Sequence, residues 1–126
     1  MRVLLDTHAF LWAATQPKKL PSKLSVYLQS SHERLVSTAS LWEIAIKVRN
    51  GKLVMEEPRE QLVRAAADLK AVILPVRANH VFRTLALPGH HKDPFDRLLV
   101  AQAIEEGAAL ATDDEMTRRY AVDIFW

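Results

Sequence analysis

A chain of 126 residues is long enough for one domain around one hydrophobic core and too short for two, so we expect a single domain over residues 1–126. The sequence has no cysteine, which excludes disulfides, thiolate chemistry and cysteine-based zinc sites. With 49% hydrophobic residues and no long apolar run, a folded cytoplasmic protein without a membrane span is expected, and the net charge of +2 permits an anionic partner such as nucleic acid.

The first predicted element is a buried strand at residues 2–5, an apolar run that stops abruptly at Asp6. Ligands bind beyond the carboxyl ends of strands in open α/β sheets, which makes Asp6 the first candidate site residue. Residues 9–14 predict a short helix, and residues 21–31 predict a second one. The apolar positions of this second helix are Leu24, Val26, Tyr27 and Leu28.

A second strand is predicted at residues 34–36, followed by a helix at residues 41–48 that ends at Asn50 and Gly51. Ser40 and Glu43 have the spacing of a capping box, in which the glutamate bonds back to the start of its own helix. The alternative is that Glu43, early in a helix that follows a strand, lies near the same sheet edge as Asp6. The two interpretations are compatible in part, and both stay open.

Residues 58–72 predict a helix of moderate amphipathicity, residues 73–76 a short strand, and residues 78–87 a further helix. The apolar positions of the first of these helices are Leu62, Val63, Ala66 and Leu69. The loop that follows carries two adjacent histidines, His90 and His91. Without cysteine, and without a histidine at helical spacing, this pair is a weak zinc signal, so we interpret both as loop or substrate-side groups.

Two carboxylates stand at the start of the next predicted helix, which is apolar and ends at Gly107. Asp93 occupies its N-cap position, Pro94 its first position and Asp96 its third. In the plainer interpretation, Asp93 caps backbone N–H groups and Asp96 favours the positive end of the helix dipole. In the other, the two carboxylates offer hard oxygen ligands to Mg²⁺ or Mn²⁺, together with carboxylates from elsewhere in the chain.

The last buried strand is predicted at residues 108–111, and it ends in Thr112, Asp113 and Asp114. Thr112 or Asp113 is expected to cap a short helix at residues 115–119, which explains one of the two aspartates but not both. An edge strand is predicted at residues 122–126, with Trp126 in the core or at an interface.

Strands alternate with helices along the chain, which predicts an α/β fold with a mainly parallel sheet between two layers of helices. In such a sheet the acids that follow the strands meet at one edge, and the helix start at Asp96 can lie on the same rim. Carboxylates brought this close repel one another, and a divalent cation removes that penalty. Such a cation orients water and neutralises charge on a scissile phosphate, so the acids predict metal-assisted phosphodiester hydrolysis.

Four segments of the chain resemble the motifs of PIN-domain ribonucleases, specifically VapC-type toxins of bacterial toxin–antitoxin pairs. The segments are Leu4-Leu5-Asp6-Thr7-His8, Ser40-Leu41-Trp42-Glu43-Ile44-Ala45-Ile46-Lys47, Asp93-Pro94-Phe95-Asp96-Arg97-Leu98-Leu99-Val100-Ala101-Gln102-Ala103 and Thr112-Asp113-Asp114. The resemblance implies a PIN-like three-layer α/β/α sandwich and an endoribonuclease that depends on Mg²⁺ or Mn²⁺ and cuts single-stranded or loop RNA. It also implies a cognate antitoxin protein that blocks the site. Homodimers are usual among such proteins, with exposed apolar residues such as Trp42 or Val54 as candidate contacts.

Position by position, the resemblance implies a set of catalytic, metal-binding acids, which are Asp6, Glu43, Asp96 and Asp114. Asp93 belongs to the Asp-Pro-Phe-Asp-Arg form of the motif and is an additional metal-binding candidate. Asp114 is preferred over Asp113 because the motif reads Thr, any residue, acid. The candidates for a supporting role are Thr112, by hydrogen bonding, Asp113, and Arg97, which either binds phosphate or pairs with a carboxylate.

Three other functions account for part of this pattern. A phosphoacceptor domain also gathers aspartates at strand ends, but it normally has paired acids at the first strand and a lysine after the last. A phosphatase with an aspartyl nucleophile usually carries acids two positions apart after the first strand, where this chain has His8. A catalytically silent PIN fold that only binds RNA or protein is the third, and the filling of every acidic position argues against it.

Overall fold

The computed structural model describes residues 1–126 and contains a four-stranded sheet in the order β3-β2-β1-β4. The strands are β1 (Arg2–Leu5), β2 (Glu33–Ser37), β3 (Val72–Leu74) and β4 (Ala109–Ala111). All three strand pairs are parallel, which confirms the predicted sheet. Leu5 lies in register with Val36 on one side and Ala111 on the other, so the residues that follow β1 and β4 emerge at the same edge.

Helices precede or follow every strand. The α-helices are α1 (Thr7–Thr15), α2 (Ser22–Leu28), α3 (Thr38–Arg49), α4 (Pro58–Asp68), α5 (Ala78–Arg83) and α6 (Pro94–Glu106). The 3₁₀ turns are η1 (Pro17–Lys19), η2 (Thr84–Ala86) and η3 (Thr117–Arg119). No helix combines the length and the apolar character needed to cross a membrane.

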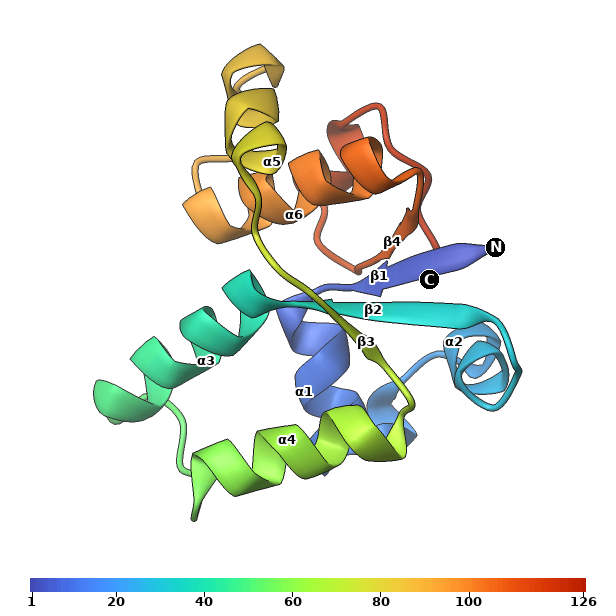
Figure 1. Cartoon of the computed structure of the whole chain (residues 1–126), viewed down its shortest axis with the longest axis vertical. Helices are drawn as coiled ribbons and strands as arrows, with labels where there is room; N and C mark the ends of the chain where they lie inside the picture. Colours follow the sequence, from blue (N-terminus) through green and yellow to red (C-terminus); the bar gives the residue numbers. More distant parts are fainter.

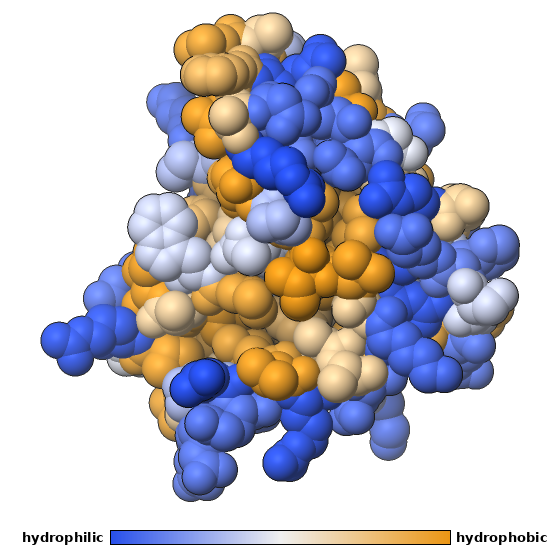
Figure 2. Space-filling model, in the orientation of Figure 1, coloured by the Kyte–Doolittle hydropathy of each residue, from blue (hydrophilic) through white to orange (hydrophobic).

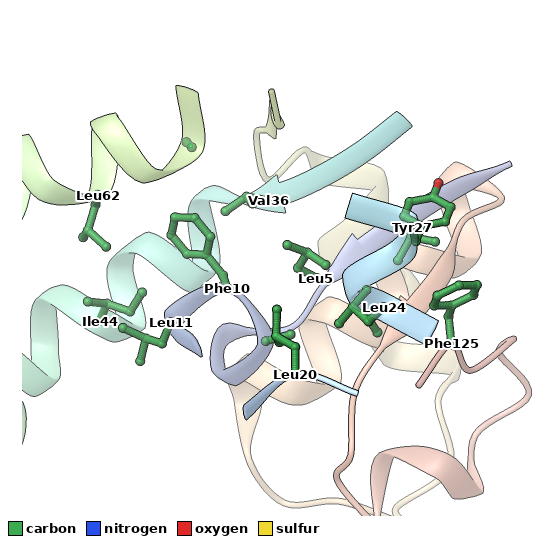
Figure 3. Close-up of a cluster of buried hydrophobic side chains, with 14 residues drawn as sticks. Leu5, Phe10, Leu11, Leu20, Leu24, Tyr27, Val36, Ile44, Leu62 and Phe125 are labelled. Carbon is green, nitrogen blue, oxygen red and sulfur yellow. The ribbon is translucent and has the colours of Figure 1, made fainter. Parts of the chain in front are cut away.

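The two faces of the sheet carry separate hydrophobic clusters. Val3 and Leu5 of β1 belong to the larger cluster, with side chains from α1, α2, α3 and α4 (Figure 3). Leu4 belongs to the other cluster, with Leu99 and its neighbours on α6. Successive side chains of a strand point to opposite faces, which explains the division. Figure 1 shows the resulting sandwich, with α1, α3 and α4 on one side of the sheet and α5 and α6 on the other.

Several observed helices are shorter than the predicted ones. α2 ends at Leu28 rather than at residue 31. α4 ends at Asp68 rather than at residue 72, since Lys70 takes a left-handed backbone conformation with φ 52°. The helix predicted at residues 78–87 is divided into α5 and η2. Val26 and Val63, which were expected on apolar faces, are 68% and 65% exposed because these faces are narrower than the sequence pattern suggests.

The edge strand predicted at residues 122–126 is wrong. A single parallel bridge joins Leu110 to Ile124, with hydrogen bonds from Leu110 N to Asp123 O at 2.8 Å and from Phe125 N to Leu110 O at 2.9 Å. The short helix predicted at residues 115–119 is only the 3₁₀ turn η3. The tail is held by its aromatic side chains instead, because Phe125 is part of the larger cluster and Trp126 packs against it.

Candidate metal centre

The carboxyl end of β1 delivers Asp6 to the start of α1. Asp6 is the N-cap of this helix, and its Oδ1 accepts a hydrogen bond from Ala9 N at 2.7 Å. Burial raises the pKa of Asp6, against the opposing effect of hydrogen bonds from the Thr112 side chain and the Ala9 backbone. Thr112 is buried and its Oγ1 also accepts from Asp114 N at 3.1 Å, so this side chain links the acids that follow β1 and β4.

Glu43 lies in the second turn of α3, and the capping box predicted for it with Ser40 is wrong. The helix begins earlier than expected, with Ser37 as its N-cap and the Ser37 hydroxyl accepting from Ala39 N at 3.0 Å. Glu43 reaches across to α1 instead, where its Oε1 accepts from Thr7 Oγ1 at 2.6 Å. Its other oxygen, Oε2, lies 3.4 Å from Lys47 Nζ on the next turn.

The start of α6 is as the sequence predicts. Asp93 is the N-cap, and its Oδ1 accepts from Phe95 N at 2.8 Å and from Asp96 N at 3.1 Å. Pro94 occupies the first turn, where its missing N–H costs nothing. Because Asp93 takes the backbone donors, the Asp96 carboxylate is left to face the strand ends.

The two aspartates after β4 have different environments. Asp114 Oδ2 accepts from Thr117 N at 2.8 Å and from Thr117 Oγ1 at 2.7 Å, so Asp114 holds η3, and the prediction that Thr112 or Asp113 caps this turn is wrong. Burial alone would raise the pKa of Asp114, but these hydrogen bonds and the neighbouring His91 outweigh it and lower the pKa. The Asp113 side chain is 66% exposed and lies 3.4 Å from Arg118 Nη2.

Carboxylates from distant parts of the chain line one small pocket at this edge of the sheet. The pocket has a volume of about 220 Å³, and Figure 1 places this edge between the first turns of α3 and α6. Its acidic residues are Asp6, Glu43, Asp93, Asp96 and Asp114. The rest of its wall is Thr7, His8, Leu11 and Lys47. Of the acids singled out in the sequence, Asp113 alone lies outside this wall.

The pocket disfavours the charged form of Asp96. Burial raises the pKa of Asp96 to about 7, and the charges of Asp93, Glu43 and Asp114 add to the rise, while His91 opposes it. An ordinary aspartate is fully ionised at neutral pH, whereas the raised pKa of Asp96 makes its ionisation unfavourable there. The hydrogen-bond donors around the pocket therefore do not offset the repulsion among its carboxylates.

His91 is a member of this cluster that the sequence reasoning missed. Its Nε2 lies 2.9 Å from Asp96 Oδ2 and 3.1 Å from Asp114 Oδ2, between the two carboxylates and aligned with neither for a hydrogen bond. Its Nδ1 accepts from Asp93 N at 3.1 Å, which places the ring proton on Nε2. The one available signal was its position two residues before a helix N-cap, where a side chain can fold back onto the helix start.

Arg97 does not pair with a carboxylate, which is one of the two roles considered for it. Its guanidinium donates to Pro88 O at 2.9 Å, to Thr84 O at 3.0 Å and to the Tyr120 hydroxyl at 3.1 Å, and no carboxylate pairs with it. The same hydroxyl accepts from His91 N at 2.9 Å. Arg97 and Tyr120 thus hold the loop before α6 and, through it, the position of His91.

This donor set suits a hard divalent cation. One atom each of His91, Asp96 and Asp114 lies within 4.8 Å of the others, with His91 offering its Nε2 proton rather than a lone pair. Apart from His8 and Lys47, the polar side chains that line the pocket offer carboxylate or hydroxyl oxygens. Oxygen-rich sites of this kind favour Mg²⁺ and Mn²⁺, whereas zinc sites rely on histidine and cysteine. A cation would relieve the repulsion that raises the pKa of Asp96.

Comparisons of the sequence with known proteins point to one family. The family model described as PIN domain matches residues 3–123. A relative from Mycobacterium tuberculosis, Ribonuclease VapC22, is 32% identical over 121 residues, which span 94% of this chain and 91% of that protein.

Solved structures share the fold. The chain is similar to a chain of VapBC2 from Rickettsia felis, in a structure bound to a promoter DNA fragment, with a TM-score of 0.72, 18% identity and coverage of 98% of this chain and 97% of that one. A chain of DNA-bound VapBC from Salmonella typhimurium gives a TM-score of 0.69, 18% identity and coverage of 98% and 96%. A toxin–antitoxin complex from Klebsiella pneumoniae gives 0.64, 15% identity and coverage of 98% and 96%.

Proposed function

The chain belongs to the PIN domain family, and from this membership we propose that it is an endoribonuclease that hydrolyses phosphodiester bonds of RNA as the toxin of a toxin–antitoxin pair. The observation that carries the proposal is the pocket in which five carboxylates meet. The mycobacterial relative is named a ribonuclease, which supports the same activity. The proposed place of action is the cytoplasm, where cellular RNA is available.

The proposed cofactor is Mg²⁺ or Mn²⁺, held by the acids of the pocket. Asp6, Asp96 and Asp114 are the proposed ligands, joined by Glu43 and by the free oxygen of Asp93. The raised pKa of Asp96 supports this assignment, since a carboxyl that is reluctant to ionise alone ionises readily beside a cation. When bound, the cation supplies a polarised water and neutralises the charge that builds on the scissile phosphate.

The side chains of this chain hold the acids in place for that chemistry. Thr7 fixes one oxygen of Glu43 and leaves the other beside Lys47. Thr112 and Thr117 orient Asp6 and Asp114 through hydrogen bonds. We assign the catalytic role to Asp6, Glu43, Asp96 and Asp114, and a positioning role to Thr112.

An antitoxin protein is the proposed partner. One of the similar solved structures is named a toxin–antitoxin complex, and two are named VapBC, which supports this partner. An apolar groove of about 680 Å³ between α3 and α4 is a suitable docking place, and Figure 2 shows apolar side chains gathered over that region. Leu41, Val48 and Leu62 are among the residues that line it.

A homodimer is also proposed. Several large apolar side chains are exposed, including Trp42 at 64%, Val54 at 91% and Leu85 at 85%. Burial of such side chains between two copies would remove them from water. Sedimentation velocity should give the mass of a dimer, and Leu85→Glu, on η2, should shift the mass toward that of the monomer.

Cleavage of RNA under metal control tests the activity. Purified protein should cut single-stranded RNA with Mg²⁺ or Mn²⁺ and stop when EDTA is added. Asp6→Asn should abolish cleavage, while Asp68→Asn, an exposed aspartate of α4 outside the pocket, should not. Cleavage that continues in EDTA would contradict the metal proposal. RNA binding without any cleavage would identify a PIN fold that only binds.

A further inference from the structure

A second cavity adjoins the acidic pocket. It has a volume of about 230 Å³ and is lined by Asp6, His8, Trp12, Asp113, Asp114 and Trp126. Asp6, His8 and Asp114 also line the acidic pocket, so the two spaces share a wall. The residues that line only this cavity are the two tryptophans, Trp12 and Trp126, and the exposed Asp113.

These rings lie close together but do not cover one another. The His8 and Trp12 centroids are 5.6 Å apart with the planes tilted by 45°, and the Trp12 and Trp126 centroids are 6.1 Å apart with the same tilt. Both tryptophans pack against the larger hydrophobic cluster and are only partly buried. A purely structural role explains the buried edges of the two rings, but it does not explain why their remaining surface lines a cavity beside the acids.

We propose that this cavity binds an unpaired base of the RNA substrate, belonging to a nucleotide next to the phosphate that is cut. This inference rests on the proposed ribonuclease activity and adds a subsite to it. Single-stranded RNA is recognised by stacking of splayed-out bases on aromatic side chains. The shared wall of Asp6 and Asp114 sets the spacing, because a phosphate at the acids leaves the attached sugar and base beside Trp12 and Trp126.

The size and charge of the cavity agree with this occupant. Its volume lies below the roughly 300–1,000 Å³ that is typical of drug-sized ligands, which suits one planar group rather than a larger molecule. Lys19 Nζ lies 5.7 Å from the centroid of Trp12, so a cation stands near the aromatic wall where an RNA backbone would pass.

The polar wall of the cavity favours particular bases. Asp6 and Asp114 are engaged by hydrogen bonds and belong to the acidic pocket. Asp113 is 66% exposed and only its Oδ1 faces Arg118, which leaves its Oδ2 as the acceptor that a base can reach. An ionised carboxylate accepts hydrogen bonds and donates none. Adenine, cytosine and guanine offer an exocyclic amino group to such an acceptor, whereas uracil offers only its ring N3–H, so the subsite favours bases with an amino group over uracil.

RNA binding by a cleavage-deficient protein tests the subsite. The probes are short fluorescein-labelled oligoadenylate, oligocytidylate and oligouridylate, and their anisotropy is measured with the Asp96→Asn protein in Mg²⁺. Trp12→Leu should weaken binding of oligoadenylate by about 5- to 160-fold, the expected cost of losing one stacked base, and Trp12→Phe should restore most of the affinity. Oligouridylate should bind weakest of the three probes. Asp113→Asn should reduce the differences in affinity among them.

Controls separate this proposal from the ribonuclease assignment. Trp42→Leu removes an exposed tryptophan outside the cavity and should leave the ranking of the probes unchanged. Trp126→Leu serves as the second variant if Trp12→Leu does not fold. Folded Trp12 and Trp126 variants that bind all three probes like their parent would overturn the subsite while wild-type cleavage still stands. Loss of inhibition by the antitoxin without any change in RNA binding would assign the cavity to the protein partner and overturn it as well.

Discussion

Asp93 and Asp96 lie three residues apart on one helix and differ in what their carboxylates bind. One carboxylate oxygen of Asp93 accepts hydrogen bonds from two backbone N–H groups at the start of α6. Asp96 has no such donors and faces other acids, so burial and its neighbours raise its pKa to about 7. The difference follows from position alone, because the N-cap takes the free backbone donors of a helix.

Asp96→Asn is expected to stabilise the metal-free protein and to abolish cleavage. The folded pKa, about 7, lies above the ordinary value of 3.8, so the native state binds the extra proton between these pH values. The wild-type free energy of unfolding therefore falls as the pH rises through that window, and the asparagine variant lacks this fall. Near pH 8 the variant should be more stable by about 1–3 kcal/mol, discounted for partial exposure.

Urea denaturation in EDTA at about pH 5 and about pH 8 measures this difference. Asp68→Asn is the matched control and should follow the wild-type profile at both pH values. If the free energy of unfolding changed equally with pH in the wild type and in the Asp96 variant, the carboxylates would be too well solvated to repel one another.

At the scale of elements, the end of α6 depends on one backbone conformation. Gly107 is the C-cap and takes φ 62°, a left-handed conformation that side chains disfavour. This residue turns the chain from α6 into β4 and so positions the acids that follow that strand.

Gly107→Ala should destabilise the protein by about 1–2 kcal/mol. No atom lies within 4 Å of the added Cβ, so the cost comes from the backbone conformation and not from a clash. Gly89→Ala also has open space around its Cβ but no left-handed φ, and it should change the free energy of unfolding by only a few tenths of a kcal/mol. Equal losses in the two variants, measured by urea denaturation, would contradict this account.

The loop before α6 depends on the hydroxyl of Tyr120. This buried oxygen accepts from His91 N and from Arg97 Nη1, groups that are 29 and 23 positions away in the sequence. Tyr120→Phe should cost about 1–3 kcal/mol by leaving these donors without an acceptor, and it should lower Mg²⁺ affinity because His91 and Asp93 shift. Calorimetric titration with Mg²⁺ measures the second effect.

Tyr27→Phe is the control for Tyr120→Phe. The Tyr27 hydroxyl donates to Glu33 O at 2.7 Å and lies far from the acidic pocket at the other end of the strands. Its loss should reduce stability without altering Mg²⁺ affinity. A comparable fall in affinity for both variants would mean that general loosening, and not the loop, affects the metal centre.

The sequence predicts those features that depend on neighbouring residues. The N-cap at Asp93, the stop at Gly107 and the strand that ends at Asp6 are local patterns, and the structure has all three. The capping box at Ser40 was wrong because Ser37, at the end of a strand, starts the helix one turn earlier. The sequence assigns His91 to the loop or the substrate side, but its contact with Asp96 and Asp114 was not predicted, since the position of the loop also depends on Tyr120 far along the chain. The tail at residues 122–126 has a strand-like pattern, yet only Ile124 bridges to β4.

At the scale of the whole molecule, charge is unevenly distributed. Five of the 15 acidic residues line the pocket together with Lys47, which leaves ten acidic residues to offset 16 of the 17 Lys and Arg over the rest of the chain. The small formal charge of +2 thus combines an acidic pocket with a basic remainder. The basic surface outside the pocket attracts a polyanion. The acidic pocket repels it unless a cation neutralises the carboxylates.

Metal binding should therefore stabilise the whole fold. Mg²⁺ at about 100 times its dissociation constant should add about 2.7 kcal/mol to the free energy of unfolding, seen as a higher Tm in a thermal scan. The Tm of Asp6→Asn should change little when Mg²⁺ is added, whereas the Tm of Asp68→Asn should rise as much as that of the wild type. An unchanged Tm of the wild type at saturating Mg²⁺ would contradict a preformed metal centre.

Asp6 and Asp114 follow β1 and β4, which are neighbouring strands of the sheet although the two acids lie 108 positions apart in the sequence. The acidic pocket therefore exists only in the fully folded chain. Any loss of pairing between β1 and β4 separates these two acids, so metal binding at the pocket reports on the folding of the whole molecule.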